Sequence, residues 1–205
     1  MYIIINNNMD KLKYLIIEKE KDIPTTIYYI DNVFTDQELD FVKRLNYLDG
    51  EHQNKEISRK QLWFHNDNKY FCSTWNKRYD RWLSNEYFEE LNNLQNKVKN
   101  IVNNLGIIIN INSCLINYYQ DGNDFIPPHR DTPLSFGIYP TIINVSFGET
   151  RNLILKNDKE KYTFELKSNS IFIMMGSSQK YYTHEIEKSD TIYPRYSLTF
   201  REHIN

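Results

Sequence analysis

The sequence predicts a single domain that is mainly β with flanking helices, and three observations support this prediction. The chain has 205 residues, a length that suits one domain with a sizeable core and is short for two. After residue 106 the apolar residues change from a period near 3.6 to short runs with a period near 2. Seven or eight short strands in about 100 residues are typical of a β-sandwich or a barrel-like roll.

The N-terminal part of the chain is predicted to hold a tail, a strand and a helix. Residues 1–26 are polar and rich in Lys and Glu, so we expect a tail there. It leads into a strand at residues 27–30, where Ile and Tyr favour extended structure. A helix is predicted over residues 35–47, because Thr35 and Glu38 occupy the two positions of a capping box.

A second helix is predicted between residues 86 and 105, where apolar residues recur at steps of three and four. Gly106 follows at the position where a helix cap favours positive φ. Strands are then predicted at 107–119, 141–147, 151–156, 161–166, 170–175, 181–186 and 192–201. The domain therefore covers residues 27–205, with its β core in 113–205.

The composition excludes several classes of protein. Cys72 and Cys114 are the only cysteines, so there is no disulfide framework, and the first residues lack the features of a secretory signal. We expect an intracellular protein, nuclear or cytoplasmic, that is not secreted. There is no run of 18 apolar residues, which argues against a membrane-spanning helix. The net charge of −2 means that any contact with nucleic acid must be local. We expect a monomer.

Three residues form a candidate metal site. His129 and Asp131 are two residues apart in a run that is predicted to be extended, so both side chains point to the same face. His184 lies in a later predicted strand and can supply a third ligand. Two histidines and one carboxylate are typical of non-haem Fe(II) oxygenases. Alternatively, His184 is a hydrogen-bonded core histidine and Asp131 is a turn residue before Thr132.

The last predicted strand carries polar side chains on one face. Strand alternation places Arg195, Ser197, Thr199 and Arg201 on one side and Tyr196, Leu198 and Phe200 on the other. If that polar face is buried, its arginines need anions, and a planar guanidinium suits the carboxylate of a 2-oxo acid bound to the metal. Alternatively, the arginines belong to a solvated face and pair with surface carboxylates.

The chain resembles the AlkB-like Fe(II)/2-oxoglutarate dioxygenases that remove alkyl groups from nucleic acids. The resemblance covers most of the chain from about Ile30. Its pieces are Cys114–Tyr119 followed by Asp121–Gly122, His129–Asp131, Val145–Gly148 with Thr150–Arg151, Met174–Gly176, His184 and Arg195–Arg201. The HRD form, the VSFG run and the tripeptide Arg59–Lys60–Gln61 look most like the eukaryotic DNA-repair branch.

This resemblance implies a double-stranded β-helix (jelly-roll) core and the cofactors Fe(II), 2-oxoglutarate and O2. His129, Asp131 and His184 would hold the catalytic iron. The residues that would bind 2-oxoglutarate are Asn117, Tyr119, Arg195, Thr199 and Arg201. The implied reaction hydroxylates the carbon of an N-alkyl group and releases formaldehyde, and the implied partner is alkylated DNA or RNA.

The sequence departs from the family pattern at two positions. Many members carry Asn two residues after the first arginine of the last strand, whereas this chain has Ser197. Relatives often have an acidic residue shortly after the HxD motif that helps to read the damaged base, and Thr132–Leu134 contains none.

The segment Lys55–Arg81 is predicted to be a nucleotide-recognition lid within the helical part, residues 27–112. Seven basic and three acidic residues give it a net charge of +4, and Trp63, Phe64, Tyr70, Phe71 and Trp75 are interleaved. Cations can neutralise phosphates while aromatic rings stack on an extruded base. The predicted substrate-binding residues are Arg59, Lys60, Tyr70, Phe71 and Arg130. Alternatively, Trp63, Phe71 and Trp75 are core residues, and Arg130 pairs with Asp124.

The predicted function is oxidative demethylation of N-alkylated bases in DNA, or in RNA. A second hypothesis keeps the chemistry but makes the substrate a protein or a small molecule. A third is a catalytically inactive relative that binds nucleic acid without turnover.

Overall fold

The computed structural model describes residues 2–6, 12–19, 22–52, 55–75 and 82–205. Its strands are β1 Tyr2–Asn6, β2 Leu12–Ile17, β3 Thr25–Ile30, β4 Leu48–His52, β5 Lys55–His65, β6 Ser113–Tyr119, β7 Ile126–His129, β8 Ile142–Gly148, β9 Arg151–Lys156, β10 Lys161–Leu166, β11 Ser170–Met175, β12 Thr183–Ile186 and β13 Arg195–Arg201. Its α-helices are α1 Asp36–Leu39, α2 Glu89–Asn104, α3 Pro133–Phe136 and α4 Ser178–Tyr181. Two short 3₁₀ helices span Asp40–Arg44 and Ser73–Trp75. The prediction of a mainly β fold with flanking helices is confirmed.

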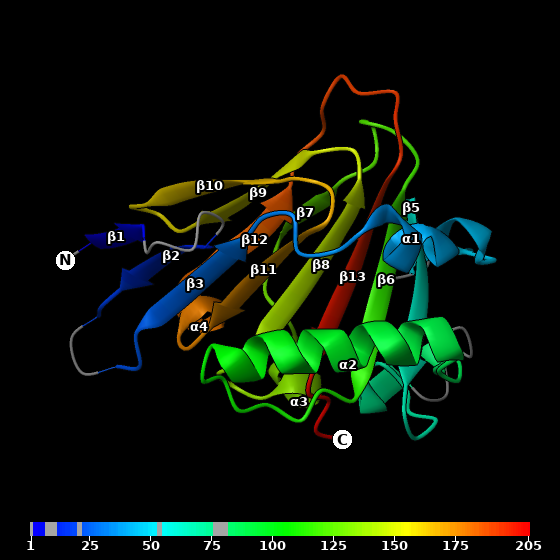
Figure 1. The fold of residues 1–205 in the computed structure, drawn as a ribbon, viewed down its shortest axis with the longest axis horizontal. Coiled ribbons are helices and arrows are strands. Elements are labelled where there is room, and N and C mark those ends of the chain that lie inside the picture. Colours follow the sequence, from blue (N-terminus) through cyan, green and yellow to red (C-terminus); the bar gives the residue numbers. More distant parts are fainter. Residues whose placement is uncertain (1, 7–11, 20–21, 53–54, 76–81) are drawn as a thin grey trace.

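The described strands form two sheets. The larger has the order β1-β2-β3-β11-β8-β13-β6-β5-β4, and the smaller has the order β10-β9-β12-β7. All of the paired strands within these sheets are antiparallel. Helix α2 lies across one face of the larger sheet (Figure 1).

The hydrophobic core has one layer on each face of the larger sheet. On the α2 face, Val98 and Val102 of the helix belong to the same cluster as Tyr196, Leu198 and Phe200 of β13. On the other face, residues of the smaller sheet such as Leu153, Leu155 and Ile186 pack with Ile142, Phe172 and Met174. The side chains of β13 that alternate with its apolar residues therefore point between the two sheets. This is the face where the candidate site lies.

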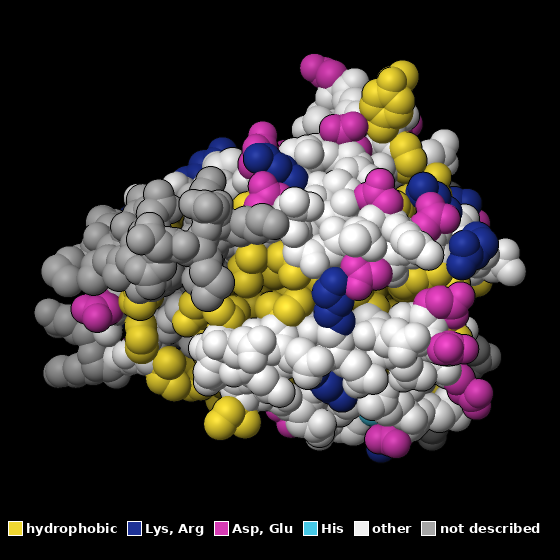
Figure 2. Space-filling view, in the orientation of Figure 1, with side chains coloured by type: hydrophobic (Ala, Val, Ile, Leu, Met, Phe, Trp, Pro, Cys, Tyr) yellow, Lys and Arg dark blue, Asp and Glu magenta, His cyan; other side chains and the backbone are white. Residues whose placement is uncertain are grey.

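The outer surface of α2 carries mostly uncharged polar side chains, with acidic and basic residues interspersed (Figure 2). Within the described part of the chain, no helix is long and apolar enough to cross a membrane.

The predicted helix ends agree with the structure in part. Thr35 caps α1 as the capping box requires, accepting from the Glu38 amide while the Glu38 side chain accepts from the Thr35 amide. The helical segment ends at Arg44, earlier than the predicted residue 47. After α2, Gly106 has a φ of +75°, and Ile107 donates to the Val102 carbonyl oxygen at 3.0 Å. These are the features of a Schellman cap.

Three segments differ from the prediction. The expected N-terminal tail contains β1 and β2, and β2 pairs along its length with β3. Residues 107–112 precede β6 without joining a strand. Residues 55–65, which we expected in a lid, form β5 between β4 and β6 of the larger sheet.

Candidate functional site

The three predicted metal ligands converge. His129 ends β7, and His184 lies directly opposite it on β12, with 4.1 Å between the ring centroids. Asp131 follows two residues after the strand, and its Oδ1 lies 4.0 Å from His129 Nε2. One ligand atom from each of the three residues lies within 4.8 Å of the others. The spacing of the HxD motif and the pairing of β7 with β12 together create this cluster.

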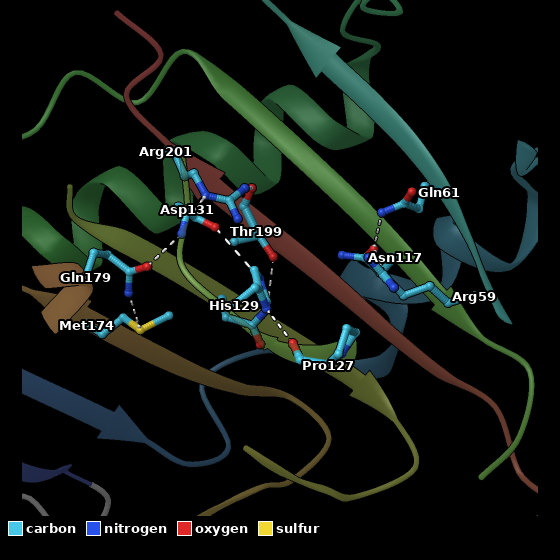
Figure 3. Close-up of polar contacts among 11 residues, drawn as sticks. Arg59, Gln61, Asn117, Pro127, His129, Asp131, Met174, Gln179, Thr199 and Arg201 are labelled. Atoms are coloured by element: carbon cyan, nitrogen blue, oxygen red, sulfur yellow. Dashed lines mark hydrogen bonds and ion pairs between the residues drawn. The ribbon is translucent and has the colours of Figure 1, made fainter. Parts of the chain in front are cut away.

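Hydrogen bonds to the protein hold His129 and Asp131 in place (Figure 3). His129 Nδ1 donates to the Pro127 carbonyl oxygen at 2.9 Å, which leaves the Nε2 lone pair available for a metal. Asp131 Oδ2 accepts from Arg201 Nε at 2.6 Å. The Asp131 amide donates to Gln179 Oε1 at 2.9 Å, so α4 also holds this segment in place.

The electrostatics keep the three side chains in the form that binds metal. Burial lowers the pKa of His184 to about 3 and also lowers the pKa of His129. Burial alone would raise the pKa of the Asp131 carboxyl, but Arg201 and the two histidines outweigh it and hold that pKa below its usual value. The cluster thus offers two neutral imidazoles and a carboxylate at neutral pH, the donor set that suits non-haem Fe(II). The residues present fit this metal.

A cavity of about 400 Å³ extends from the triad along the inward faces of β6 and β13. Its walls include all five predicted 2-oxoglutarate residues, namely Asn117, Tyr119, Arg195, Thr199 and Arg201. The predicted polar face of the last strand is therefore buried, and the alternative of a solvated face is wrong.

The two arginines of β13 have different partners. Arg201 is paired with Asp131. Arg195 is 1% exposed, and its Nη2 donates to Ser146 Oγ at 2.9 Å, but its Nε and Nη1 have no hydrogen-bond partner among the described residues. A buried cation without an anion is costly. The guanidinium of Arg195 therefore fits the far carboxylate of a bound 2-oxo acid.

Sequence reasoning missed Asn144 of β8, which lines the cavity beside the residue that departs from the family pattern. Asn144 Nδ2 donates to the Ser197 hydroxyl and to Thr199 Oγ1 at 3.2 Å. An amide is thus present next to Ser197 after all, supplied by the neighbouring strand. Asn144 and Ser146 are polar and inward-facing in an otherwise apolar run, which was the available signal.

The predicted substrate residues fall into two groups. Arg59, Phe71 and Arg130 line the cavity. Arg130 Nε donates to the Tyr182 carbonyl oxygen at 3.2 Å, rather than to Asp124 as the alternative required. Lys60 instead pairs with Asp49 at 3.1 Å, and Tyr70 is absent from the cavity wall that the described residues form.

The lid prediction is wrong for its first part and untested for its last. Trp63 is 1% exposed and packs with Phe71 at a centroid distance of 4.9 Å, so the alternative of core packing applies to this residue. Phe64 lies in the core beneath α2. Lys77, Arg78, Asp80 and Arg81 lie outside the described residues, and the side chains of Lys55, Glu56 and Trp75 are likewise not described.

An aromatic wall closes one side of the cavity. Phe71 and Trp82, which both line it, lie 5.1 Å apart between ring centroids, and Phe136 lies 5.5 Å from Phe71. Trp82 was not among the predicted site residues, because it follows the expected lid. Leu115 completes this apolar surface.

The chain matches the family model described as "2OG-Fe(II) oxygenase superfamily" over residues 26–201. Among curated proteins, it is 32% identical over 102 residues to "Alpha-ketoglutarate-dependent dioxygenase alkB homolog 3" of Mus musculus, an alignment that covers 44% of this chain and 36% of the mouse protein. It is 28% identical over 116 residues to "DNA oxidative demethylase ALKBH2" of Arabidopsis thaliana, which covers 44% of this chain and 37% of the plant protein. The alignments thus span little more than a third of these relatives.

Two solved structures share the fold. The structure described as "The structure of OsALKBH1" superposes with a TM-score of 0.63 at 15% identity, covering 86% of this chain and 97% of that chain. An oxidoreductase of the 2OG-Fe(II) oxygenase family from Burkholderia pseudomallei gives a TM-score of 0.56 at 14% identity, covering 85% and 84%. At these identities the likeness concerns the fold alone, and it agrees with the jelly-roll expectation.

Proposed function

Since the chain belongs to the 2OG-Fe(II) oxygenase superfamily, we propose that it is an oxidative demethylase of N-alkylated bases in nucleic acid. The observation that carries the proposal is the arrangement of one cavity. A His-Asp-His cluster lines this cavity, and so does the buried guanidinium of Arg195, which has two nitrogens without a hydrogen-bond partner among the described residues. The cluster suits a metal, and the guanidinium suits the carboxylate of a ligand bound to that metal.

With Fe(II) and 2-oxoglutarate bound, such a site uses O2 to convert 2-oxoglutarate to succinate and carbon dioxide and to hydroxylate a substrate carbon. For an N-methyl group, the hydroxymethyl product loses formaldehyde as the C–N bond breaks and the nitrogen regains a proton. The protein supplies binding and orientation for this chemistry.

Each part of the cavity has a role in this proposal. His129, Asp131 and His184 hold the metal, and Arg201 orients the Asp131 carboxylate through its 2.6 Å hydrogen bond. Arg195 binds the far carboxylate of 2-oxoglutarate. The apolar wall of Phe71, Trp82 and Leu115 excludes water and offers aromatic faces to a planar base.

The substrate class is supported by the relatives and by the enclosed shape of the site. The Arabidopsis relative is described as a DNA oxidative demethylase. Because the metal ligands lie inside a cavity, an alkyl carbon reaches them only if the base leaves its helix. A single strand, or a flipped base, meets this requirement.

The test is turnover of methylated oligonucleotides by purified protein with Fe(II) and 2-oxoglutarate. We expect equal amounts of formaldehyde and succinate, together with the unmethylated base. His129→Ala should abolish turnover, and Arg44→Met provides a matched surface control because Arg44 is exposed and far along the chain from the site. No formaldehyde from any methylated DNA or RNA oligonucleotide would refute the proposal.

A second candidate function rests on the absence of an acidic residue from Thr132–Leu134, the segment after the HxD motif whose first residue, Thr132, lines the cavity. A hydroxylase acting on a protein or a small molecule does not need that carboxylate. In the same assay, succinate without formaldehyde from oligonucleotides would favour this candidate.

A further inference from the structure

We propose that Arg59 and Gln61 are positioning residues that turn the amide of Asn117 toward the cosubstrate. Both lie on β5, in the segment that the sequence analysis assigned to substrate recognition. The inference deepens the proposed function, since it assumes that the cavity binds 2-oxoglutarate. It assigns Arg59 and Gln61 to the cosubstrate and not to the nucleic acid.

The three side chains form one hydrogen-bonded group on adjacent strands. Gln61 lies directly opposite Asn117 in the pairing of β5 with β6. Asn117 Oδ1 accepts from Arg59 Nε at 3.0 Å and from Gln61 Nε2 at 2.9 Å. All three residues are at least nine-tenths buried and line the cavity.

The chemistry of these donors fixes which way the Asn117 amide points. A guanidinium only donates hydrogen bonds, so the atom facing Arg59 must be the amide oxygen. The opposite orientation would set the Asn117 NH2 group against the Arg59 guanidinium, which cannot accept a hydrogen bond. Figure 3 accordingly shows the amide nitrogen of Asn117 on the side away from Arg59 and Gln61.

The outward-turned NH2 group is available to a ligand. Within the described part of the chain, no residue accepts a hydrogen bond from Asn117 Nδ2. Ser197 lies directly opposite Asn117 on β13, so this amide is on the strand pair that also carries Arg195. An N–H donor at this place matches the oxygen atoms of a 2-oxo acid, whose carboxylates and ketone only accept.

The contacts and the burial of Arg59 argue against a role in binding the nucleic acid. Its Nη1 donates to the Phe125 carbonyl oxygen at 3.3 Å, which ties β5 to the loop before β7. Burial lowers the pKa of Arg59, while Tyr119 and Asp124 act in the opposite direction. A guanidinium engaged at Nε and Nη1 and 8% exposed is poorly placed to reach a phosphate.

The test measures the affinity of the Mn(II)-loaded protein for 2-oxoglutarate by calorimetry, in variants that change the donors without removing Asn117. Arg59→Met and Gln61→Met should each weaken 2-oxoglutarate binding about tenfold, near the upper end of what one hydrogen bond contributes. Arg59→Lys keeps a donor near Asn117 and should recover most of that loss. Lys60→Met is the matched control, because Lys60 is the intervening residue and pairs with Asp49.

A second measurement separates a positioning role from a structural or a substrate role. Affinity for a methylated oligonucleotide should change less than twofold in Arg59→Met and Gln61→Met, and Mn(II) affinity should stay at the parent value. Weaker oligonucleotide binding with unchanged 2-oxoglutarate affinity would overturn the inference and restore Arg59 to the substrate. If Arg59→Met does not fold, Gln61→Met decides in the same way.

Failure of the proposed function would look different. A parent protein that binds 2-oxoglutarate but releases no formaldehyde from oligonucleotides would refute demethylation, while the comparison of 2-oxoglutarate affinities among the variants would still test the positioning role.

Discussion

Asp131 is bound through one oxygen to Arg201 and presents the other to the two histidines. Arg201 Nε donates to Asp131 Oδ2 at 2.6 Å, and Asp131 Oδ1 lies 4.0 Å from His129 Nε2. Both side chains of the ion pair are 5% exposed. In the metal-free protein, Arg201 therefore neutralises the buried carboxylate of Asp131. The second oxygen of that carboxylate points to the place where a metal would bind.

Replacing Arg201 should destabilise the metal-free protein strongly. Arg201→Met leaves the Asp131 carboxylate buried without its cation, and breaking a buried pair in this way costs about 3 kcal/mol. Urea unfolding in the presence of a chelator measures the change. Arg44→Met is the control, because Arg44 has a side chain that is 64% exposed and lies 3.6 Å from Asp40, so it should cost less than about 0.5 kcal/mol. A similar small loss in Arg201→Met would contradict the role assigned to this ion pair.

Replacing Arg195 should change the stability little and should weaken the binding of 2-oxoglutarate strongly. The Nε and Nη1 atoms of Arg195 have no hydrogen-bond partner among the described residues. Arg195→Met removes a buried charge that lacks an anion, and this gain offsets the lost hydrogen bond to Ser146, so the free energy of unfolding should change by less than about 1 kcal/mol. Binding of 2-oxoglutarate should weaken by about 100-fold, since charge-assisted bonds to its carboxylate are lost. Calorimetry on the Mn(II)-loaded protein measures this affinity. A stability loss as large as that of Arg201→Met, with intact binding, would show that Arg195 is purely structural.

Strand alternation predicted the cavity residues of β13, whereas the strand β5 and the position of Asn144 in the cavity wall were not predicted. Alternation along residues 195–201 placed Arg195 and Arg201 correctly, because a period of 2 decides which face a side chain joins. The strand β5 was missed because Arg59, Lys60 and Gln61 resemble a charged surface. Arg59 and Gln61 face a polar cavity inside the fold, where the hydrophobic pattern no longer distinguishes buried from exposed positions.

The metal ligands were predicted from the sequence, but Gln179, which holds Asp131 in place, was not. His129 and Asp131 are two residues apart in the sequence, so their spacing predicted a shared face, and His184 with the polar face of the last strand supported the metal site. Gln179 holds the Asp131 amide at 2.9 Å from a different element, α4, and only the tertiary structure brings them together. Asn144 is likewise brought to the site by the tertiary structure, since its role depends on the pairing of β8 with β13.

Ser197 and Asn144 are expected to be coupled. Asn144 Nδ2 contacts the Ser197 hydroxyl, so it occupies the space that a longer side chain at position 197 would need. Ser197→Asn should therefore weaken 2-oxoglutarate binding by overpacking. Ser197→Asn combined with Asn144→Ser moves the amide to β13 and should recover affinity. A double-mutant cycle on the 2-oxoglutarate affinity measures the coupling, and additive effects within about 0.5 kcal/mol would refute it.

His65 should make the protein sensitive to mild acid. Burial, together with the neighbouring His203, lowers the pKa of His65 to about 4. Its ordinary value is near 6.5, so the unfolded chain binds a proton more readily than the folded protein does. The contribution of this residue to stability is then complete above pH 6.5 and is lost as the pH falls from about 6.5 to about 4.

The variant His65→Gln removes this titration, and Gln can still offer an oxygen to the Asp67 amide, which now donates to His65 Nδ1 at 2.9 Å. Between pH 7.5 and pH 4.5 the parent should lose more stability than the variant, as measured by the urea midpoint at each pH. The ring of His203 lies 5.1 Å from that of His65, and the pKa of His203 is also lowered by burial, so a smaller acid effect should persist in His65→Gln. Parallel stability curves for the parent and His65→Gln would mean that His65 is protonated as easily in the folded protein as in the unfolded chain.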